Sequence, residues 1–156
     1  MLYRKAYDRL LTWKGQPKRK ALCVMGARQI GKTTLIRQFG KEQYSCFVEI
    51  NFITDTDATK IFAGNLDANT IITNLTAYTR KPMIPGNTLV LLDEIQACPN
   101  ARTAIKFLVE DGRFDYIESG SLLGVRHKEV RSYPVGFEEL YQMYPMDLEE
   151  YLWANG

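Results

Sequence analysis

The chain has 156 residues, of which 46% are hydrophobic and 24% charged, with 20 Lys and Arg against 18 Asp and Glu. This length suits one domain with a buried core, and the composition excludes a disordered tail, a collagen-like fibre and a disulfide-rich scaffold. No apolar run approaches the roughly 18 residues that a membrane span needs, and the N-terminus lacks the apolar stretch of a signal peptide. We therefore expect a cytoplasmic protein without a membrane segment, formed by one domain over residues 1–156. The cysteines show no metal-ligand spacing and are predicted to be reduced thiols: Cys23, Cys46 and Cys98.

The N-terminal segment is basic and the C-terminal segment acidic. Residues 1–20 carry seven basic side chains and one acid, whereas residues 135–156 carry five acids and no base. Apolar side chains at helical spacing predict an amphipathic helix within residues 1–15, with the basic side chains on its wet face. The stripe consists of Tyr3, Tyr7, Leu10 and Leu11. Nucleic-acid contact through this helix is a weaker alternative, because no motif of interleaved aromatic and basic residues accompanies it.

Short apolar runs predict five strands along the chain. The expected strands cover residues 21–25, 46–52 and 88–92, a weaker candidate at 114–118, and a fifth near 141–144. Because the first and third runs are continuously apolar, they are typical of strands that are buried on both faces.

Helical patterns fill the intervals between these strands. An apolar stripe begins at Leu35 and is predicted to end at Gly40, a natural residue after a helix. A second stripe over residues 101–109 has Asn100 available as N-cap and Gly112 as terminator. One or two helices are expected within residues 55–80, around a break at 64–67. Strands that alternate with helices predict an α/β fold with a mainly parallel sheet, covered on both faces.

The segment between the first strand and the next helix has the pattern G-x-x-x-x-G-K-[ST] of a phosphate-binding loop, or Walker A motif. It consists of Gly26, Ala27, Arg28, Gln29, Ile30, Gly31, Lys32, Thr33 and Thr34. Glycines let the backbone curl until successive N–H groups point at phosphate oxygens, and the helix that follows adds the positive end of its dipole. In this pattern Lys32 reaches the β- and γ-phosphates, the Thr33 hydroxyl is a ligand for Mg²⁺, and Thr34 lies near the α-phosphate. Phosphate binding is therefore the expected function of the loop.

A second motif follows the third predicted strand, where an apolar run ends in Asp93 and Glu94. In a nucleotide site, Asp93 would hold Mg²⁺ together with Thr33, through water, and Glu94 would orient and deprotonate the attacking water. A solvated acidic pair at a strand end is the simpler reading of these two residues alone. Combined with the phosphate loop, two adjacent acids favour hydrolysis over transfer of the phosphate to a small molecule.

The fourth predicted strand ends in the turn Ser119-Gly120-Ser121. Ligands of open parallel sheets bind at the carboxyl ends of the strands, so a hydroxyl here could contact the γ-phosphate or the attacking water. A plain Ser-Gly turn is equally compatible with the spacing. We assign Ser121 to the candidate catalytic set, together with Lys32 and Glu94.

With these motifs in place, the sequence resembles the AAA-type ATPase domain at the N-terminus of many prokaryotic ATP-binding proteins. The resemblance rests on residues 26–34, 92–96, 119–125, 133–136 and 144–152. It implies a P-loop NTPase of AAA+ type with a five-stranded sheet, Asp93 and Glu94 as the Walker B motif, and a sensor in the turn at residues 119–121. ATP is implied as the nucleotide, and no guanine-reading motif contradicts it.

The resemblance also implies partners. AAA-type sites usually take an arginine from a neighbouring subunit, so self-association would complete the site; Arg113, Arg126 and Arg131 are candidates that no motif separates. Longer relatives continue past the position of Trp153 into a further C-terminal domain. We accordingly expect this chain to be a truncated form in which that domain is absent.

Taken together, the sequence predicts an ATPase that binds ATP with Mg²⁺ and hydrolyses it slowly to ADP and phosphate, coupling nucleotide state to conformational change in a protein client or attached domain. One alternative is a nucleotide-binding switch or scaffold with little turnover. Others are a nucleic-acid-associated ATPase and, as an enzyme of another class, a small-molecule kinase.

Overall fold

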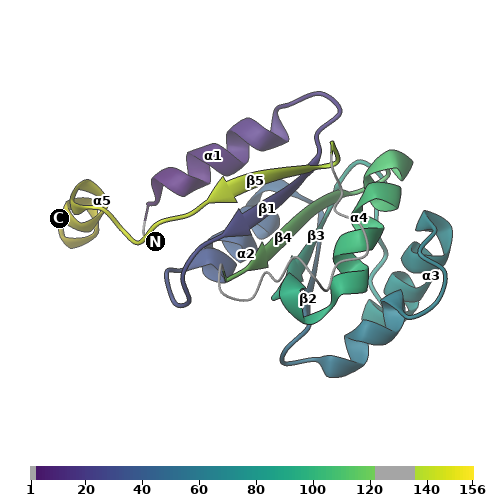
Figure 1. The fold of residues 1–156 in the computed structure, drawn as a ribbon. Helices are drawn as coiled ribbons and strands as arrows, with labels where there is room; N and C mark the ends of the chain where they lie inside the picture. The colour runs from purple at the N-terminus through teal and green to yellow at the C-terminus, as the bar shows by residue number, and fades with distance from the viewer. Residues whose placement is uncertain (1–2, 122–135) are drawn as a thin grey trace.

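The computed structural model describes residues 3–121 and 136–156. Figure 1 shows their arrangement and labels the α-helices and β-strands; the short 3₁₀ helices are named η in the text. In chain order the elements are α1 (Lys5–Lys14), β1 (Ala21–Met25), α2 (Lys32–Gln43), β2 (Cys46–Asn51), η1 (Thr56–Phe62), α3 (Ala68–Thr79), β3 (Thr88–Asp93), η2 (Ile95–Ala97), α4 (Pro99–Asp111), β4 (Asp115–Gly120), β5 (Glu138–Gln142) and α5 (Leu148–Asn155).

The strands form one parallel sheet in the order β2-β3-β4-β1-β5. Every residue of β1 and β3 is buried, whereas the edge strands β2 and β5 carry partly exposed positions. The continuously apolar runs therefore mark the interior strands, as expected for a sheet covered on both faces. Because all strands run the same way, their carboxyl ends share one edge of the sheet. The predicted α/β fold with a five-stranded parallel sheet is confirmed.

Two hydrophobic cores lie on opposite faces of the sheet. On one face, α1 and α2 cover the sheet with Leu10, Trp13, Ile36 and Phe39, which surround Leu22 of β1. On the other face, α3, α4 and η1 pack over Val90, Leu92 and Tyr116 among others. The alternation of side chains along each strand divides the sheet residues between these two cores.

The predicted end of the second helix at Gly40 is wrong. Helix α2 continues to Gln43, and Gly40 is buried within it. A Cβ atom at Gly40 would lie 2.3 Å from the Phe47 ring of β2, far inside van der Waals contact. Glycine is needed here because a side chain would prevent the close packing of α2 on β2.

Two further boundaries differ from the sequence predictions. Helix α4 begins at Pro99, with Cys98 in the N-cap position, so Asn100 lies inside the first turn and donates to the Phe62 carbonyl at 3.2 Å. Proline suits this position because N–H groups in the first turn of a helix have no intrahelical acceptor, so the N–H that proline lacks is not needed. Strand β5 begins at Glu138, before the predicted 141–144, because its pairing with β1 starts at Ala21. Gly112 ends α4 at φ +75° as predicted, and the 55–80 region forms η1 and α3 around the expected break.

The first helix is amphipathic as predicted, but its buried stripe shares only Leu10 with the predicted one, and Tyr7 packs partly buried beside it. Ala6, Leu10 and Trp13 are buried, whereas Tyr3 and Leu11 are largely exposed. The stripe therefore follows the i, i+4, i+7 spacing from Ala6, which the aromatic Tyr3 had obscured.

The basic side chains of the N-terminal segment are paired with the acidic C-terminal segment. Lys5 lies 2.7 Å from Asp147 and 2.6 Å from Glu149, and Arg9 forms an ion pair with Glu139. The basic N-terminal segment and the acidic C-terminal segment therefore form ion pairs with each other. The prediction that the basic side chains of this segment are all exposed to solvent is wrong for Arg4, whose guanidinium is buried.

All three cysteines are buried and free, as predicted for reduced thiols. Within residues 3–121 and 136–156, the search for a helix of sufficient length and hydropathy to traverse a lipid bilayer finds none.

Candidate nucleotide-binding site

The predicted phosphate loop connects β1 to α2 at the carboxyl edge of the sheet. Gly31 stands at φ +91° and Gln29 at φ +62°, so two residues of the loop have left-handed backbone and reverse its direction. A Cβ atom on Gly26 would lie 2.5 Å from the Met143 carbonyl oxygen, which follows β5. Glycine is therefore required at both ends of the loop: at Gly31 because of its positive φ, and at Gly26 because no room is left for a Cβ atom. This strand–loop–helix arrangement is the context that the motif needs.

Lys32 is the first residue of α2 and folds back over its own loop. Its Nζ donates to the carbonyl oxygens of Gly26 at 2.9 Å and Ala27 at 2.6 Å. Partial burial lowers the pKa of Lys32, while the nearby charges of Glu94 and Asp93 act in the opposite direction. The ammonium group is thus held by neutral carbonyls at the concave side of the loop, where phosphate oxygens can replace them.

Asp93 is the centre of a polar row across the sheet. Strand register places Asn51, Asp93 and Ser119 side by side on β2, β3 and β4. The Asp93 carboxylate accepts from Thr33 Oγ1 at 2.9 Å, from Asn51 Nδ2 at 3.4 Å and from the Ser119 hydroxyl. Asp93 is 3% exposed, so these bonds offset the desolvation of a buried carboxylate. The structure therefore brings together Thr33 and Asp93, the two residues expected to hold Mg²⁺.

Glu94 follows Asp93 with its backbone in the left-handed region, at φ +56°. A left-handed residue other than glycine or asparagine is strained, and such strain is concentrated at functional sites. The Glu94 side chain accepts a hydrogen bond from Gln96 Nε2. It lines a cleft of about 390 Å³ together with residues of the phosphate loop and Ile53. The predicted base is thus aimed into the same cleft as the predicted phosphate site.

Ser119 and Ser121 occupy different environments. Ser119 donates to Asp93 and is fully buried. Ser121 is 4% exposed, and in the described part of the chain its Oγ has no hydrogen-bond partner. A buried hydroxyl without a partner is uncommon in proteins and is accounted for when a ligand or water completes it.

The sequence did not point to Asn51 or Gln96, and it indicated Ser119 only as one hydroxyl of the candidate sensor turn at residues 119–121. Asn51 and Ser119 position Asp93, and Gln96 positions Glu94. Asn51 is the next-to-last residue of the second predicted strand, 46–52, and the last residue of β2, and a polar residue near that carboxyl end was the available signal. Gln96 gave no signal, because its contact depends on the turn that the left-handed Glu94 creates.

The candidate arginine fingers cannot be assigned from the geometry. Arg126 and Arg131 lie outside the described residues, as do most of the family-like segments at 119–125 and 133–136. Arg113 lies at the amino end of β4, where it pairs with Asp111 at 2.9 Å and donates to Asn69 at 2.8 Å. A hollow of about 570 Å³ also lies at this amino edge, away from the phosphate loop.

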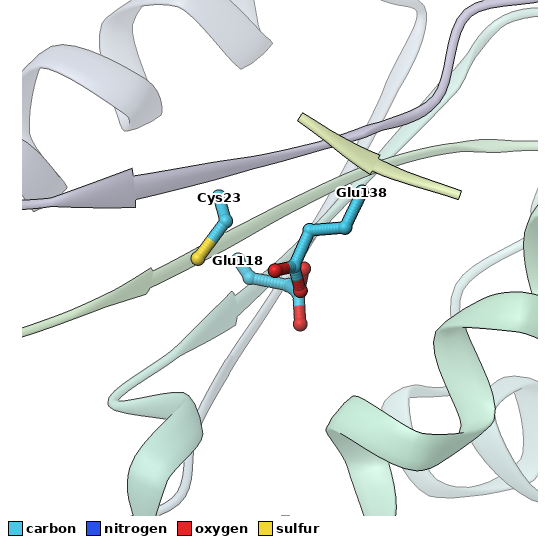
Figure 2. Close-up of side chains that lie close together, drawn as sticks. All are labelled: Cys23, Glu118 and Glu138. Atoms are coloured by element: carbon cyan, nitrogen blue, oxygen red, sulfur yellow. The ribbon is translucent and has the colours of Figure 1, made fainter. Parts of the chain in front are cut away.

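A second polar cluster is buried within the sheet, on the face that α4 covers. Figure 2 shows Cys23 of β1, Glu118 of β4 and Glu138 of β5, whose ligand atoms all lie within 4.8 Å of one another. Arg102 of α4 donates to the Glu138 carboxylate at 2.7 and 3.2 Å, with both side chains buried.

The chemistry of this cluster does not suit a metal ion. Burial raises the pKa of Glu118 well above its ordinary value, with the negative charge of Glu138 as the next cause. Burial also raises the pKa of the Cys23 thiol. Protonated carboxyl and thiol groups are poor ligands, and Glu138 already has a guanidinium partner. The raised pKa of Glu118 and the ion pair between Arg102 and Glu138 account for the cluster without a cation.

Comparison with known proteins agrees with this architecture. The family model described as an AAA domain matches residues 18–152. No curated protein sequence matches the chain significantly. A solved structure of the Aeropyrum pernix ORC1 protein, in complex with DNA, is similar with a TM-score of 0.53 and 16% identity, over 92% of this chain and 46% of that one. Another, of C. elegans PCH-2, has a TM-score of 0.49 and 18% identity, over 81% of this chain and 35% of that one.

At these identities the likeness to ORC1 is one of fold alone, and this chain spans less than half the length of either structure. The family match, by contrast, covers most of the chain and includes the phosphate loop, Asp93 and Glu94. The chain belongs to the AAA domain family of nucleotide-binding ATPases.

Proposed function

We propose that the chain binds ATP together with Mg²⁺ at the phosphate loop and hydrolyses it to ADP and phosphate. The observation that carries this proposal is the 2.9 Å contact between Thr33 Oγ1 and Asp93 Oδ2. It joins the end of the phosphate loop to the end of β3, two segments that come from different motifs. A chance Gly-Lys-Thr turn would give no reason for a buried carboxylate at this place.

The residues fit a magnesium ion. Mg²⁺ prefers oxygen ligands and keeps several waters, and Thr33 and Asp93 offer a hydroxyl and a carboxylate in contact with each other. Asn51 and Ser119 hold the remaining lone pairs of Asp93, which fixes the direction of that carboxylate. When bound, the ion would neutralise charge on the β- and γ-phosphates.

The remaining side chains suit hydrolysis. Lys32 would exchange its two carbonyl partners for phosphate oxygens and stabilise the charge that develops on them. Glu94, held by Gln96, would take a proton from the water that attacks the γ-phosphorus, while the bond to the β-phosphate oxygen breaks and ADP leaves. The unpartnered Ser121 hydroxyl would donate to the γ-phosphate.

We further propose that turnover by the isolated chain is slow and depends on self-association. An arginine supplied from a neighbouring subunit is worth roughly 10³–10⁵ in rate for this class of reaction. Coupling of nucleotide state to a protein client or a further domain would then follow from assembly. Nucleic-acid contact receives less support, because Lys5 and Arg9 of the basic helix are paired with acids of the same chain.

The decisive experiment measures ATP hydrolysis per chain across a range of protein concentrations, for the wild type and for Glu94→Gln. General-base catalysis contributes typically 10²–10⁴ in rate, so we expect the variant to lose turnover by about that factor and to keep nucleotide binding. Glu110→Gln is the matched control, since the same change lies at the opposite edge of the sheet, beside the amino-edge hollow.

Two outcomes would redirect the proposal. If Glu94→Gln turned over ATP like the wild type, Glu94 would not be the base. If saturating Mg·ATP raised the melting temperature without any turnover, the chain would be a nucleotide-binding switch; 100 times the Kd adds about 2.7 kcal/mol of stability.

A further inference from the structure

Arg4 is a buried cation that joins the phosphate loop to the C-terminal helix. It precedes α1 and is 8% exposed. Its three nitrogen atoms each have a different partner: Nη1 donates to the Ile30 carbonyl at 3.0 Å, Nη2 to the Tyr144 carbonyl at 3.0 Å, and Nε to Glu150 Oε1 at 3.2 Å. A guanidinium is costly to bury unless its fork is satisfied, so this arrangement fixes the relative position of three distant chain segments.

The contact at Ile30 lies within the phosphate loop. The carbonyl oxygen of Ile30 and the N–H of Gly31 belong to one planar trans peptide and point in opposite directions. Because Arg4 holds the oxygen, it also sets the direction of the Gly31 N–H. A charged donor on the carbonyl polarises the peptide and strengthens its N–H as a donor. Backbone N–H groups of such loops bind phosphate, so Arg4 acts on the groups that the nucleotide would meet.

The other partners of Arg4 belong to the start of α5. Glu150 accepts from Arg4 and from the Lys5 backbone N–H at 2.8 Å, and it also caps α5 in a reciprocal pair with Asp147. One carboxylate therefore serves both the helix cap and the buried arginine. A movement of the Arg4 fork would disturb the first turn of α5 directly.

Few other contacts hold α5. Figure 1 shows the helix at one end of the molecule, beside the start of α1 and beyond the end of β5. Leu148, Tyr151 and Leu152 are each more than half exposed. Among the described residues, the other contacts between α5 and the N-terminal segment are the Lys5 N–H bond to Glu150, the exposed ion pairs of Lys5, and the contacts of Lys5 and Tyr3 with the Trp153 ring. An element with so little buried contact responds to small changes at its anchor.

We infer that Arg4 is a positioning residue: it orients the Ile30–Gly31 peptide for phosphate and transmits occupancy of the phosphate loop to α5. This inference rests on the proposed nucleotide binding and adds the element that the bound nucleotide controls. By reciprocity, whatever holds α5 in place strengthens nucleotide binding, and nucleotide binding stabilises α5 to the same degree.

The test measures amide hydrogen exchange of residues 148–155 in the full chain, without nucleotide, with Mg·ADP and with a non-hydrolysable ATP analogue. In the wild type, saturating nucleotide slows exchange in α5. Arg4→Lys keeps the charge but loses the fork, so nucleotide affinity falls about tenfold, the value of one charge-assisted hydrogen bond. At saturating nucleotide this variant shows no change in α5 exchange.

Lys5→Gln is the matched control, because it removes the exposed ion pairs between α1 and α5 without touching the phosphate loop. It speeds exchange in α5 in both states but keeps the slowing by nucleotide, and it lowers nucleotide affinity much less than Arg4→Lys does. If Arg4→Lys does not fold, Glu150→Gln serves instead, since it removes the charge that anchors Arg4 and reduces the response of α5 in the same direction.

The outcomes separate this inference from the proposed function. A wild type that binds nucleotide without any change in α5, or an Arg4→Lys variant with unaltered affinity and response, overturns the role of Arg4 and leaves the ATP site standing. A wild type with no nucleotide binding overturns both.

Discussion

Glu118 and Ser119 are neighbours in β4, yet they serve two polar regions on opposite faces of the sheet. Ser119 belongs to the row at the phosphate loop, where it donates to Asp93. Glu118 belongs to the cluster under α4 with Cys23 and Glu138. Both regions place acids inside the sheet, and the difference between them lies in what satisfies each acid.

At the phosphate loop the acids stay available to a ligand. Asp93 accepts three side-chain donors, and beside it Glu94 lines an open cleft. In the α4 cluster, Arg102 pairs with the Glu138 carboxylate, and burial raises the pKa of Glu118 well above its ordinary value. A buried acid is therefore better evidence of a ligand site where it lies beside an open cleft than where a buried cation already pairs with it.

The largest expected effect on stability comes from breaking the buried ion pair of the α4 cluster. Arg102→Met leaves Glu138 buried without its cation, and loss of one partner of a buried ion pair costs about 3–5 kcal/mol. Urea unfolding measures this change in the free energy of unfolding. Arg37→Met removes the exposed pair with Glu49 and should cost at most about 1 kcal/mol. Equal losses of unfolding free energy in the two variants would show that the Arg102–Glu138 pair is not shielded from solvent.

An intermediate effect, on nucleotide affinity, is expected at the phosphate loop. Thr33→Val keeps the shape of the side chain but removes the hydroxyl that contacts Asp93. We expect affinity for Mg·ATP to fall about 10- to 100-fold, since each tenfold step corresponds to about 1.4 kcal/mol. Titration calorimetry with and without Mg²⁺ measures the loss, which should vanish when the metal is chelated. Thr103→Val, on the surface of α4, is the control; an equal effect there would exclude a specific role for Thr33.

A further effect is a change in pH dependence. The folded state holds a proton on Glu118 that the unfolded chain releases above its ordinary pKa of 4.5, so stability should fall as pH rises above that value. One proton corresponds to about 1.4 kcal/mol per pH unit. Glu118→Gln replaces the protonated carboxyl by an amide donor, and its unfolding free energy should lack this slope between about pH 5 and pH 7.

Unfolding of both proteins across this pH range gives the comparison. The other groups at the cluster are Glu138, Arg102 and Cys23, and they are common to the wild type and the variant. Parallel pH profiles would mean that Glu118 is ionised, which would return the cluster to the list of candidate cation sites.

The sequence determined the parts of the fold and site that depend on local pattern. Apolar runs without alternation located β1 and β3, because strands covered on both faces need no polar positions. The spacing of the glycines, Lys32 and Thr33 located the phosphate loop, because backbone curvature and one mobile cation are encoded in consecutive residues. Asp93 and Glu94 followed from two acids directly after a buried strand.

Tertiary structure decided what depends on contacts between distant segments. Gly40 looked like a helix end, but the Phe47 ring of β2 fills the space where its side chain would be. Arg4 looked like a wet basic residue, but its partners at Ile30, Tyr144 and Glu150 are brought to it only by folding. A side chain's charge is fixed by its type, whereas its burial and partners depend on which strands and helices become neighbours. For that reason the sequence could identify the nucleotide loop, and only the folded chain could show that Arg4 connects it to α5.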